Sequence, residues 1–141
     1  MVDTLTTAER SKRMSLVRNK DTRPEVIVRR LIFKQGYRYR LHRRDLPGNP
    51  DLVFPSKSKV IFVHGCFWHR HKSSRCKLAR LPKSRLNFWL PKLEKNRLRD
   101  RTIQTKLRKM GWRVFVIWEC QLQDTAKLQT RISSFLEREK K

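Results

Sequence analysis

The sequence predicts an α/β protein, in which a mixed central sheet is flanked by helices on both faces. Three short runs that are almost wholly apolar, 51–54, 60–63 and 113–118, supply the strands. Such runs are typical of strands covered on both faces, because neither side of the strand meets water. Segments with helix start and stop signals precede, separate and follow them. The length of 141 residues suits one domain, which we expect over 1–141.

The N-terminal part of the chain is expected to form two helices. Residues from about 6 to 18 are typical of a short basic helix. Thr22 and Glu25 then form a capping box, with Pro24 just inside the start of the second helix. This helix carries an apolar stripe and should end at Gly36, because glycine tolerates the left-handed conformation that closes a helix.

The first strands follow this helix. Residues 37–41 alternate as a strand does, and 46–50 form a loop rich in proline and glycine. The run 51–54 is predicted as a short strand, and 55–58 should turn the chain into the strand at 60–63.

The second half of the chain should add helices on either side of one more strand. In residues 65–83 the apolar residues follow no clear helix or strand periodicity. A short helix is predicted at 84–89, and a longer one at 91–110 begins with a proline, which the first turn of a helix tolerates. The strand at 113–118 and a C-terminal helix at about 125–137 complete the sheet and its cover.

The charge predicts a polyanionic partner. The chain has 36 Lys+Arg against 12 Asp+Glu, a net charge of +24, and residues 52–93 contain no acidic residue but ten basic ones. Such a surface repels itself unless a polyanion neutralises it, and DNA or RNA is the partner expected. The basic residues do not form one amphipathic helix, no apolar run approaches the roughly 20 residues of a membrane span, and no signal peptide is visible. We therefore expect no membrane partner.

The cysteines and histidines indicate a metal site. Three cysteines are an odd count in a chain without a visible secretory signal, which argues against a disulfide framework. Cys66, His71 and Cys76 follow at equal spacing, and Cys120 can supply a fourth ligand. A set of three cysteines and one histidine holds structural zinc, which would supply the folding free energy of this polar loop. The alternative is that the cysteines are small buried hydrophobic residues.

Large aromatic residues lie close to the predicted zinc ligands. Phe67 and Trp68 stand between Cys66 and His71, and Trp89 follows in the short helix. If the flanking residues bind a metal, the aromatic pair points outward, where it could wedge between bases. The alternative is that these side chains pack into the core.

Acidic and basic groups are expected to meet at the strand ends. Asp51 begins one strand and His64 ends the next, with His69 five residues on. Phosphodiester hydrolysis needs a cation for the developing charge and a base that activates water, and these residues supply both. Glu25 could orient a histidine by accepting its second N–H. Asp100 is either part of this set or a surface charge.

Several short stretches together resemble one known family. They are Leu-Pro-Gly-Asn-Pro-Asp at 46–51, Val-Ile-Phe-Val-His-Gly-Cys-Phe-Trp-His at 60–69, Phe-Trp at 88–89 with Arg-Asp-Arg at 99–101, and Trp-Glu-Cys at 118–120. On these residues the chain resembles the very short patch repair (Vsr) endonucleases over nearly its whole length. The string at 64–69 is the most specific of them.

The resemblance implies a restriction-endonuclease-like fold and a Mg²⁺-dependent enzyme that nicks double-stranded DNA. The expected substrate is a T:G mismatch left by deamination of 5-methylcytosine, cut on the 5′ side of the thymine to start repair. The resemblance also implies a bacterial, cytoplasmic protein that associates with the nucleoid. We expect a monomer, and further repair proteins are candidate partners.

The family's functional positions carry over to single residues here. Asp51 resembles the magnesium-binding carboxylate, and Val63 stands where a backbone carbonyl binds the same ion. His69 resembles the general base, and Glu25 the carboxylate that orients it. The remaining catalytic positions are a neighbouring histidine and a carboxylate near the metal-bound waters, His64 and Asp100. The wedge that enters the mismatch would comprise Phe67, Trp68 and Trp89, with a residue of the N-terminal helix, Met14, inserted from the opposite groove.

Two functions without catalysis remain as alternatives. A DNA-binding module held together by zinc would tolerate Asp51→Ala and His69→Ala with only small changes in affinity. A ribosomal or DNA-coating protein would ignore mismatches and would lose binding as salt rises.

Overall fold

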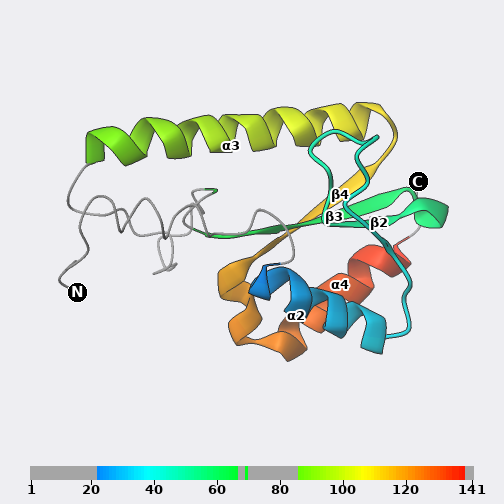
Figure 1. The fold of residues 1–141 in the computed structure, drawn as a ribbon. Coiled ribbons are helices and arrows are strands. Elements are labelled where there is room, and N and C mark those ends of the chain that lie inside the picture. Colours follow the sequence, from blue (N-terminus) through cyan, green and yellow to red (C-terminus); the bar gives the residue numbers. More distant parts are fainter. Residues whose placement is uncertain (1–21, 67–68, 70–85, 139–141) are drawn as a thin grey trace.

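A four-stranded mixed sheet with helices on both faces forms the centre of the molecule (Figure 1). The computed structural model describes residues 22–66, 69 and 86–138. The main elements, in chain order, are α2 (Arg23–Lys34), β1 (Arg40–Leu41), β2 (Leu52–Phe54), β3 (Lys59–His64), α3 (Leu86–Lys109), β4 (Arg113–Trp118) and α4 (Thr125–Glu137). Single turns of 3₁₀-helix lie at Pro55–Lys57 and Glu119–Gln123.

The strand order is β1-β2-β3-β4. The first two pairs are antiparallel, whereas β3 and β4 are parallel over their whole length, from Lys59 opposite Arg113 to His64 opposite Trp118. A parallel pair needs a long crossover connection, and α3 lies within it. The mixed sheet that the sequence predicts is therefore confirmed.

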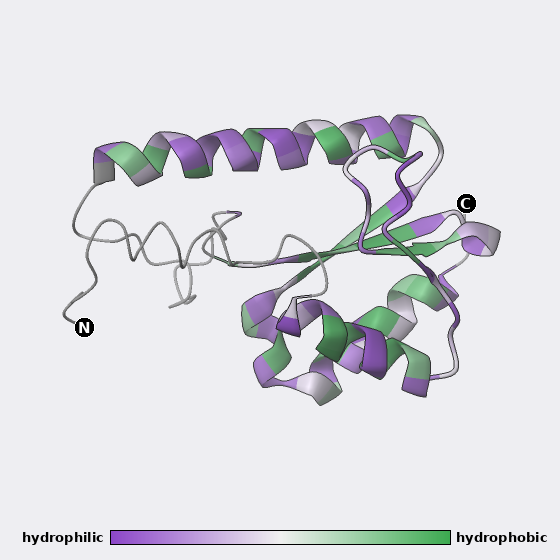
Figure 2. Ribbon diagram, in the orientation of Figure 1, coloured by the Kyte–Doolittle hydropathy of each residue, from purple (hydrophilic) through white to green (hydrophobic). Residues whose placement is uncertain are grey.

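The two central strands, β2 and β3, bury both of their faces. Leu52 and Ile61 pack with Ile32 and Ile132 in a cluster built on α2 and α4. Their neighbours in the strands, including Val53 and Val60, pack on the other face in a second cluster with Leu107 of α3. Figure 1 shows α3 on one side of the sheet and the pair α2 and α4 on the other, and Figure 2 shows the strands as the most evenly apolar part of the fold. This two-sided burial confirms the interpretation of the apolar runs.

The helix ends follow the local signals. The hydroxyl of Thr22 accepts the backbone N–H of Glu25 at 3.4 Å, so the predicted N-cap of α2 is confirmed. Asp124 caps α4 in the same way through the N–H of Lys127 at 3.1 Å. At the other end of α4 the buried ammonium of Lys59 donates to the carbonyls of Phe135, Leu136 and Arg138, where the helix dipole favours a cation.

Two expectations about elements were wrong. The two helices predicted at 84–89 and 91–110 form one helix in the part that the structure describes, and Pro91 lies inside it. Pro91 lies beyond the first turn, so its missing backbone N–H leaves one carbonyl of the preceding turn without its helical partner. The strand predicted at 37–41 is reduced to Arg40–Leu41, since residues 37–39 do not pair with β2, and His42 with φ +47 follows its end.

The N-terminal helix predicted at about 6–18 lies outside the described residues. Within the described residues, no helix combines the length and the apolar character that a membrane span requires.

Candidate active site

The predicted catalytic residues line one cavity of about 670 Å³ where β2 begins and β3 ends. The polar side chains in its wall come from α2, the β1–β2 connection, β3, the chain between β3 and α3, and α3. They are Glu25, His42, Arg44, Asn49, Asp51, His64, His69 and Asp100. Five of these eight, Glu25, Asp51, His64, His69 and Asp100, are the catalytic candidates of the sequence analysis.

The tight loop at residues 46–50 places Asp51 at the cavity. Gly48 has φ +76 and Asn49 has φ +46, and the N–H of Asn49 bonds to the carbonyl of Leu46 at 3.2 Å. A Cβ atom on Gly48 would lie 2.5 Å from Cγ2 of Ile103 in α3. Only glycine therefore fits where this loop touches α3, and the contact sets the position of Asp51 directly downstream.

Asp51 is held by the main chain of β3. Its Oδ2 accepts the backbone N–H of Val63 at 2.6 Å. Burial raises the pKa of Asp51 to about 7, with a further contribution from the negative charge of Glu25, although the Val63 hydrogen bond opposes the shift. A cation placed beside this carboxyl would relieve the unfavourable charge, so Asp51 fits a ligand of a hard divalent ion.

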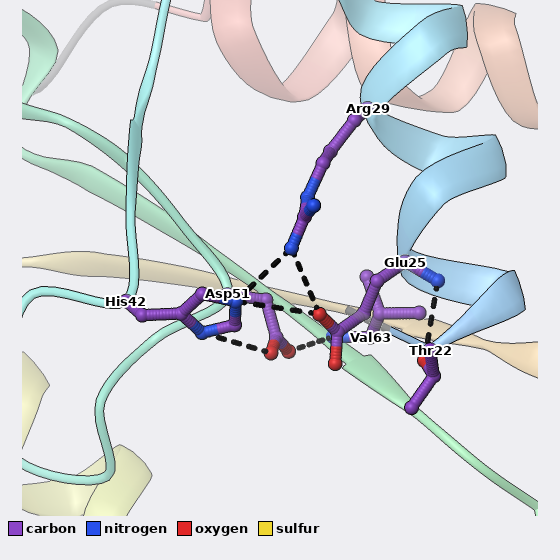
Figure 3. A network of polar contacts seen from close by, with 6 residues as sticks. All are labelled: Thr22, Glu25, Arg29, His42, Asp51 and Val63. Atoms are coloured by element: carbon purple, nitrogen blue, oxygen red, sulfur yellow. Dashed lines mark hydrogen bonds and ion pairs between the residues drawn. The ribbon is translucent and has the colours of Figure 1, made fainter. Parts of the chain in front are cut away.

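On the same side of the cavity, Glu25, His42 and Arg29 form a network with Asp51 (Figure 3). Arg29 Nη2 lies 3.1 Å from Glu25 Oε2 and 3.0 Å from His42 Nε2. The other ring nitrogen, Nδ1 of His42, lies 3.9 Å from Asp51 Oδ1. Glu25, His42 and Asp51 together offer three ligand atoms within 4.8 Å of one another.

Two histidines and a carboxylate form the opposite side. The N–H of His69 bonds to the carbonyl of Gly65 at 3.1 Å, a turn that brings its ring onto that of His64 with centroids 3.9 Å apart and 7° between planes. His69 Nδ1 lies 2.5 Å from Oδ2 of Asp100, which α3 supplies. This contact favours the proton on Nδ1, which leaves Nε2 with a lone pair for a substrate proton.

His64 is fixed in its neutral form. Burial, and then the proximity of His69, lower the pKa of His64 to about 3. The edge of Trp118 packs at 5.2 Å from its ring. At neutral pH His64 therefore adds no positive charge beside the ring of His69.

Comparisons with known proteins agree with this geometry. The sequence model of the family described as DNA mismatch endonuclease Vsr matches residues 2–75. The chain is 51% identical over 137 residues to the type II nicking enzyme V.XorIIP of Xanthomonas oryzae pv. oryzae, covering 97% of this chain and 98% of that protein. It is 42% identical to the DNA mismatch endonuclease Vsr of Escherichia coli, over 91% of this chain and 80% of the relative. The chain belongs to the Vsr family.

Membership of the Vsr family confirms the expectation of a nicking endonuclease, and it leaves the alternatives without catalysis unsupported. A solved structure extends the result to the fold. The catalytic domain of homing endonuclease I-Bth0305I matches with a TM-score of 0.55 and 23% identity, covering 82% of this chain and 94% of that one. The expected restriction-endonuclease-like α/β fold is thereby confirmed.

The partner of His69 differs from the expectation. The carboxylate that contacts His69 is Asp100, whereas Glu25 lies beside His42 and Arg29 at the other side of the cavity. Sequence position cannot show this exchange, because α3 has to fold back across the sheet before Asp100 reaches the histidine.

Sequence reasoning missed two residues that contact the candidate catalytic residues, His42 and Arg29. A signal for Arg29 was present, because a basic residue four positions after Glu25 on a helix forms an ion pair with it. His42 had no such signal. Its approach to Asp51 depends on a left-handed backbone conformation in the connection between β1 and β2.

The structure brings two of the predicted zinc ligands together. The N–H of Cys120 lies 3.4 Å from Sγ of buried Cys66, although the two residues are far apart in the sequence. A hydrogen bond of this kind favours a thiolate, which is the form that binds zinc. His71 and Cys76 lie outside the described residues, so the zinc site stays a prediction.

Of the predicted DNA wedge, Trp89 lies within the described residues. It is half-buried on α3 and meets the exposed ring of Phe88 edge to face, with centroids 5.1 Å apart. The other predicted members, Phe67, Trp68 and Met14, lie outside the described residues.

Proposed function

We propose that this enzyme nicks double-stranded DNA on the 5′ side of the thymine in T:G mismatches that arise by deamination of 5-methylcytosine. The observation that carries the proposal is the cavity in which the His69–Asp100 pair and Asp51 meet. The name and identity of the Escherichia coli relative support mismatched DNA as the substrate.

The chain's own residues divide the reaction between the two sides of the cavity. Asp100 holds the proton on Nδ1 of His69, so that Nε2 can take a proton from the attacking water. His64 stays neutral and keeps the ring of His69 in place by stacking. Asp51 and the backbone carbonyl of Val63 would hold Mg²⁺, which supplies positive charge to the scissile phosphate.

Zinc would have a structural role outside the catalytic cavity. Cys66, His71, Cys76 and Cys120 would bind it and keep the loop between them rigid. Phe67 and Trp68 on that loop, with Trp89 and Met14, would enter the base stack. Unstacking costs a few kcal/mol and costs least at a weakened pair, which favours the T:G step.

The basic surface supplies affinity that does not depend on sequence. A net charge of +24 attracts the phosphate backbone, so binding should weaken steeply with salt. We further propose that the chain acts as a monomeric single domain in the bacterial cytoplasm, on the nucleoid, where repair proteins could take over the nick.

A nicking assay on matched duplexes tests the proposal. With Mg²⁺, the wild-type chain should nick a T:G duplex and leave the T:A duplex of the same sequence intact. Asp51→Ala should abolish nicking and retain binding, since the surface charge is almost unchanged. Full nicking by Asp51→Ala, or equal cleavage of both duplexes, would overturn the assignment.

A further inference from the structure

The structure assigns a positioning role to His42, whose imidazole lies between Asp51 and Glu25 (Figure 3). The inference rests on the proposed function, because it concerns how Asp51 is held for a divalent cation. His42 follows β1 with φ +47, a conformation that residues other than glycine rarely adopt. The chain therefore accepts backbone strain at the residue that presents its ring to Asp51.

Arg29 decides which nitrogen of His42 carries the proton. Its Nη2 lies 3.0 Å from Nε2 of His42, and a guanidinium can donate but cannot accept. Glu25 Oε2 also lies 3.4 Å from Nε2, but the guanidinium is the closer neighbour, so we infer that Nε2 accepts from Arg29 and that a neutral ring carries its hydrogen on Nδ1. Arg29 is itself oriented by Glu25, whose Oε2 lies 3.1 Å from the same Nη2. Glu25 is almost completely buried, so this arrangement has little freedom.

The protonated nitrogen faces the predicted metal ligand. Nδ1 of His42 lies 3.9 Å from Oδ1 of Asp51, about 1 Å beyond an ordinary hydrogen bond. The second oxygen, Oδ2, accepts the N–H of Val63 at 2.6 Å. The main-chain N–H of Val63 thus holds one oxygen of Asp51 by a hydrogen bond, and the ring of His42 faces the other oxygen at the distance of an electrostatic contact. A hydrogen bond to one oxygen and a polar ring beside the other limit how the carboxylate can turn, and so set where its remaining lone pairs point.

Direct metal binding by His42 fits the geometry less well. Glu25, His42 and Asp51 lie close enough to surround an ion. However, the guanidinium of Arg29 already lies against both His42 and Glu25, and its positive charge would repel a second cation there. The contacts therefore favour a ring that orients Asp51 over a ring that binds the ion.

Nitrogen NMR of the full chain without metal tests the tautomer directly. Long-range ¹⁵N–¹H spectra at pH 8 should show the ring of His42 with a protonated Nδ1 and an unprotonated Nε2. Arg29→Met should remove this preference, because the donor to Nε2 is lost. A wild-type ring protonated on Nε2, or an unchanged tautomer in Arg29→Met, would overturn the inference.

Metal binding then tests the consequence without relying on activity. Mn²⁺ titration followed by electron paramagnetic resonance should give an affinity that is lower by about 10–100-fold in His42→Ala, the loss typical when the partner of a metal ligand is removed. His42→Gln should recover most of it, since an amide can accept from Arg29 and donate to Asp51. The matched control is Arg43→Gln, whose side chain pairs with Asp45 outside the cavity and whose loss should leave the affinity unchanged.

The same variants separate this inference from the proposed function. In the nicking assay, His42→Ala should need more Mg²⁺ and should approach wild-type rates when Mg²⁺ is raised, with duplex affinity unchanged. Nicking that survives Asp51→Ala would overturn the proposed function. Loss of nicking in Asp51→Ala, combined with wild-type metal affinity in His42→Ala, would overturn the role of His42 alone.

Discussion

The two sides of the cavity use the same residue types in opposite proportions. One side has two histidines and one carboxylate, His64, His69 and Asp100, whereas the other has two carboxylates and one histidine, Glu25, His42 and Asp51. Burial acts on both, yet it lowers the pKa of His64 to about 3 and raises that of Asp51 to about 7. Each group is pushed toward its neutral form. On the histidine-rich side the ring of His64 therefore stays uncharged beside His69, and on the carboxylate-rich side a cation would relieve the unfavourable negative charge.

The largest effect should come from the histidine-rich side. His69→Ala removes the group that we propose as general base, and the rate of nicking on a T:G duplex should fall about 10²–10⁴-fold. Single-turnover kinetics with saturating enzyme measure the chemical step apart from binding. An unchanged rate in His69→Ala would show that the carboxylate-rich side is sufficient for catalysis. The assignment of proton transfer to one side and cation binding to the other would then be wrong.

The second largest effect should be that of the Asp51 charge on the stability of the folded chain. Its pKa is about 7 in the folded chain against 3.8 in a free side chain. The stability that its protonated form contributes is therefore present below pH 3.8 and is lost as the pH rises through 7. Asp51→Asn keeps the shape without the charge, so at pH 8 without metal it should be more stable by an amount on the order of a few kcal/mol.

Thermal unfolding at two pH values checks this expectation. The gain in Asp51→Asn should be clear at pH 8 and small at pH 4. Added Mg²⁺ should raise the melting temperature of the wild type at pH 8 and leave that of Asp51→Asn unchanged, because the ion binds the folded state through the carboxylate. If Asp51→Asn were less stable than the wild type at pH 8, the expectation that the buried negative charge of Asp51 destabilises the folded chain would be wrong.

A smaller effect of opposite sign is expected at His64. Its pKa is about 3 in the folded chain against 6.5 when free, so its contribution to stability is complete above pH 6.5 and is lost as the pH falls toward 3. At pH 4.5 the loss should be about 2–3 kcal/mol. Urea unfolding of the wild type and His64→Phe at pH 7.5 and 4.5 separates this from other titrating groups. Equal pH dependence in both proteins would show that His64 is not responsible.

The smallest effect tests the contact that joins the two sides. Gly48 of the loop before Asp51 touches Ile103 of α3, the helix that carries Asp100. Gly48→Ala should lower stability by about 1–3 kcal/mol and should also slow nicking, because the loop must move. Gly36→Ala is the matched control. It has a similar positive φ but open space around the new methyl group, so it should lower stability and leave nicking unchanged.

The sequence predicted those elements whose signals are local. The strand at 113–118 and the helix at about 125–137 agree with β4 and α4, because an apolar run marks the strand and Asp124 caps the start of the helix. Pro91 was misinterpreted as a helix start, since sequence alone does not show that α3 begins one turn earlier.

The site was predictable as a set of residues but less so as a set of pairs. Asp51, His64 and His69 follow from strand ends that the apolar pattern locates. The pairing of His69 with Asp100 and the place of His42 depend on how α3 and the β1–β2 connection fold back over the sheet. Contacts between residues that are far apart in the chain produce no periodic pattern in the sequence, so they cannot be predicted from it in this way.

The main-chain hydrogen bond from Val63 to Asp51 has an evolutionary consequence. Every amino acid except proline carries a backbone N–H, so substitution of the side chain at position 63 leaves the donor to Asp51 intact. Residue 63 can therefore drift among lineages in response to core packing, while the catalytic geometry is inherited through the path of β3.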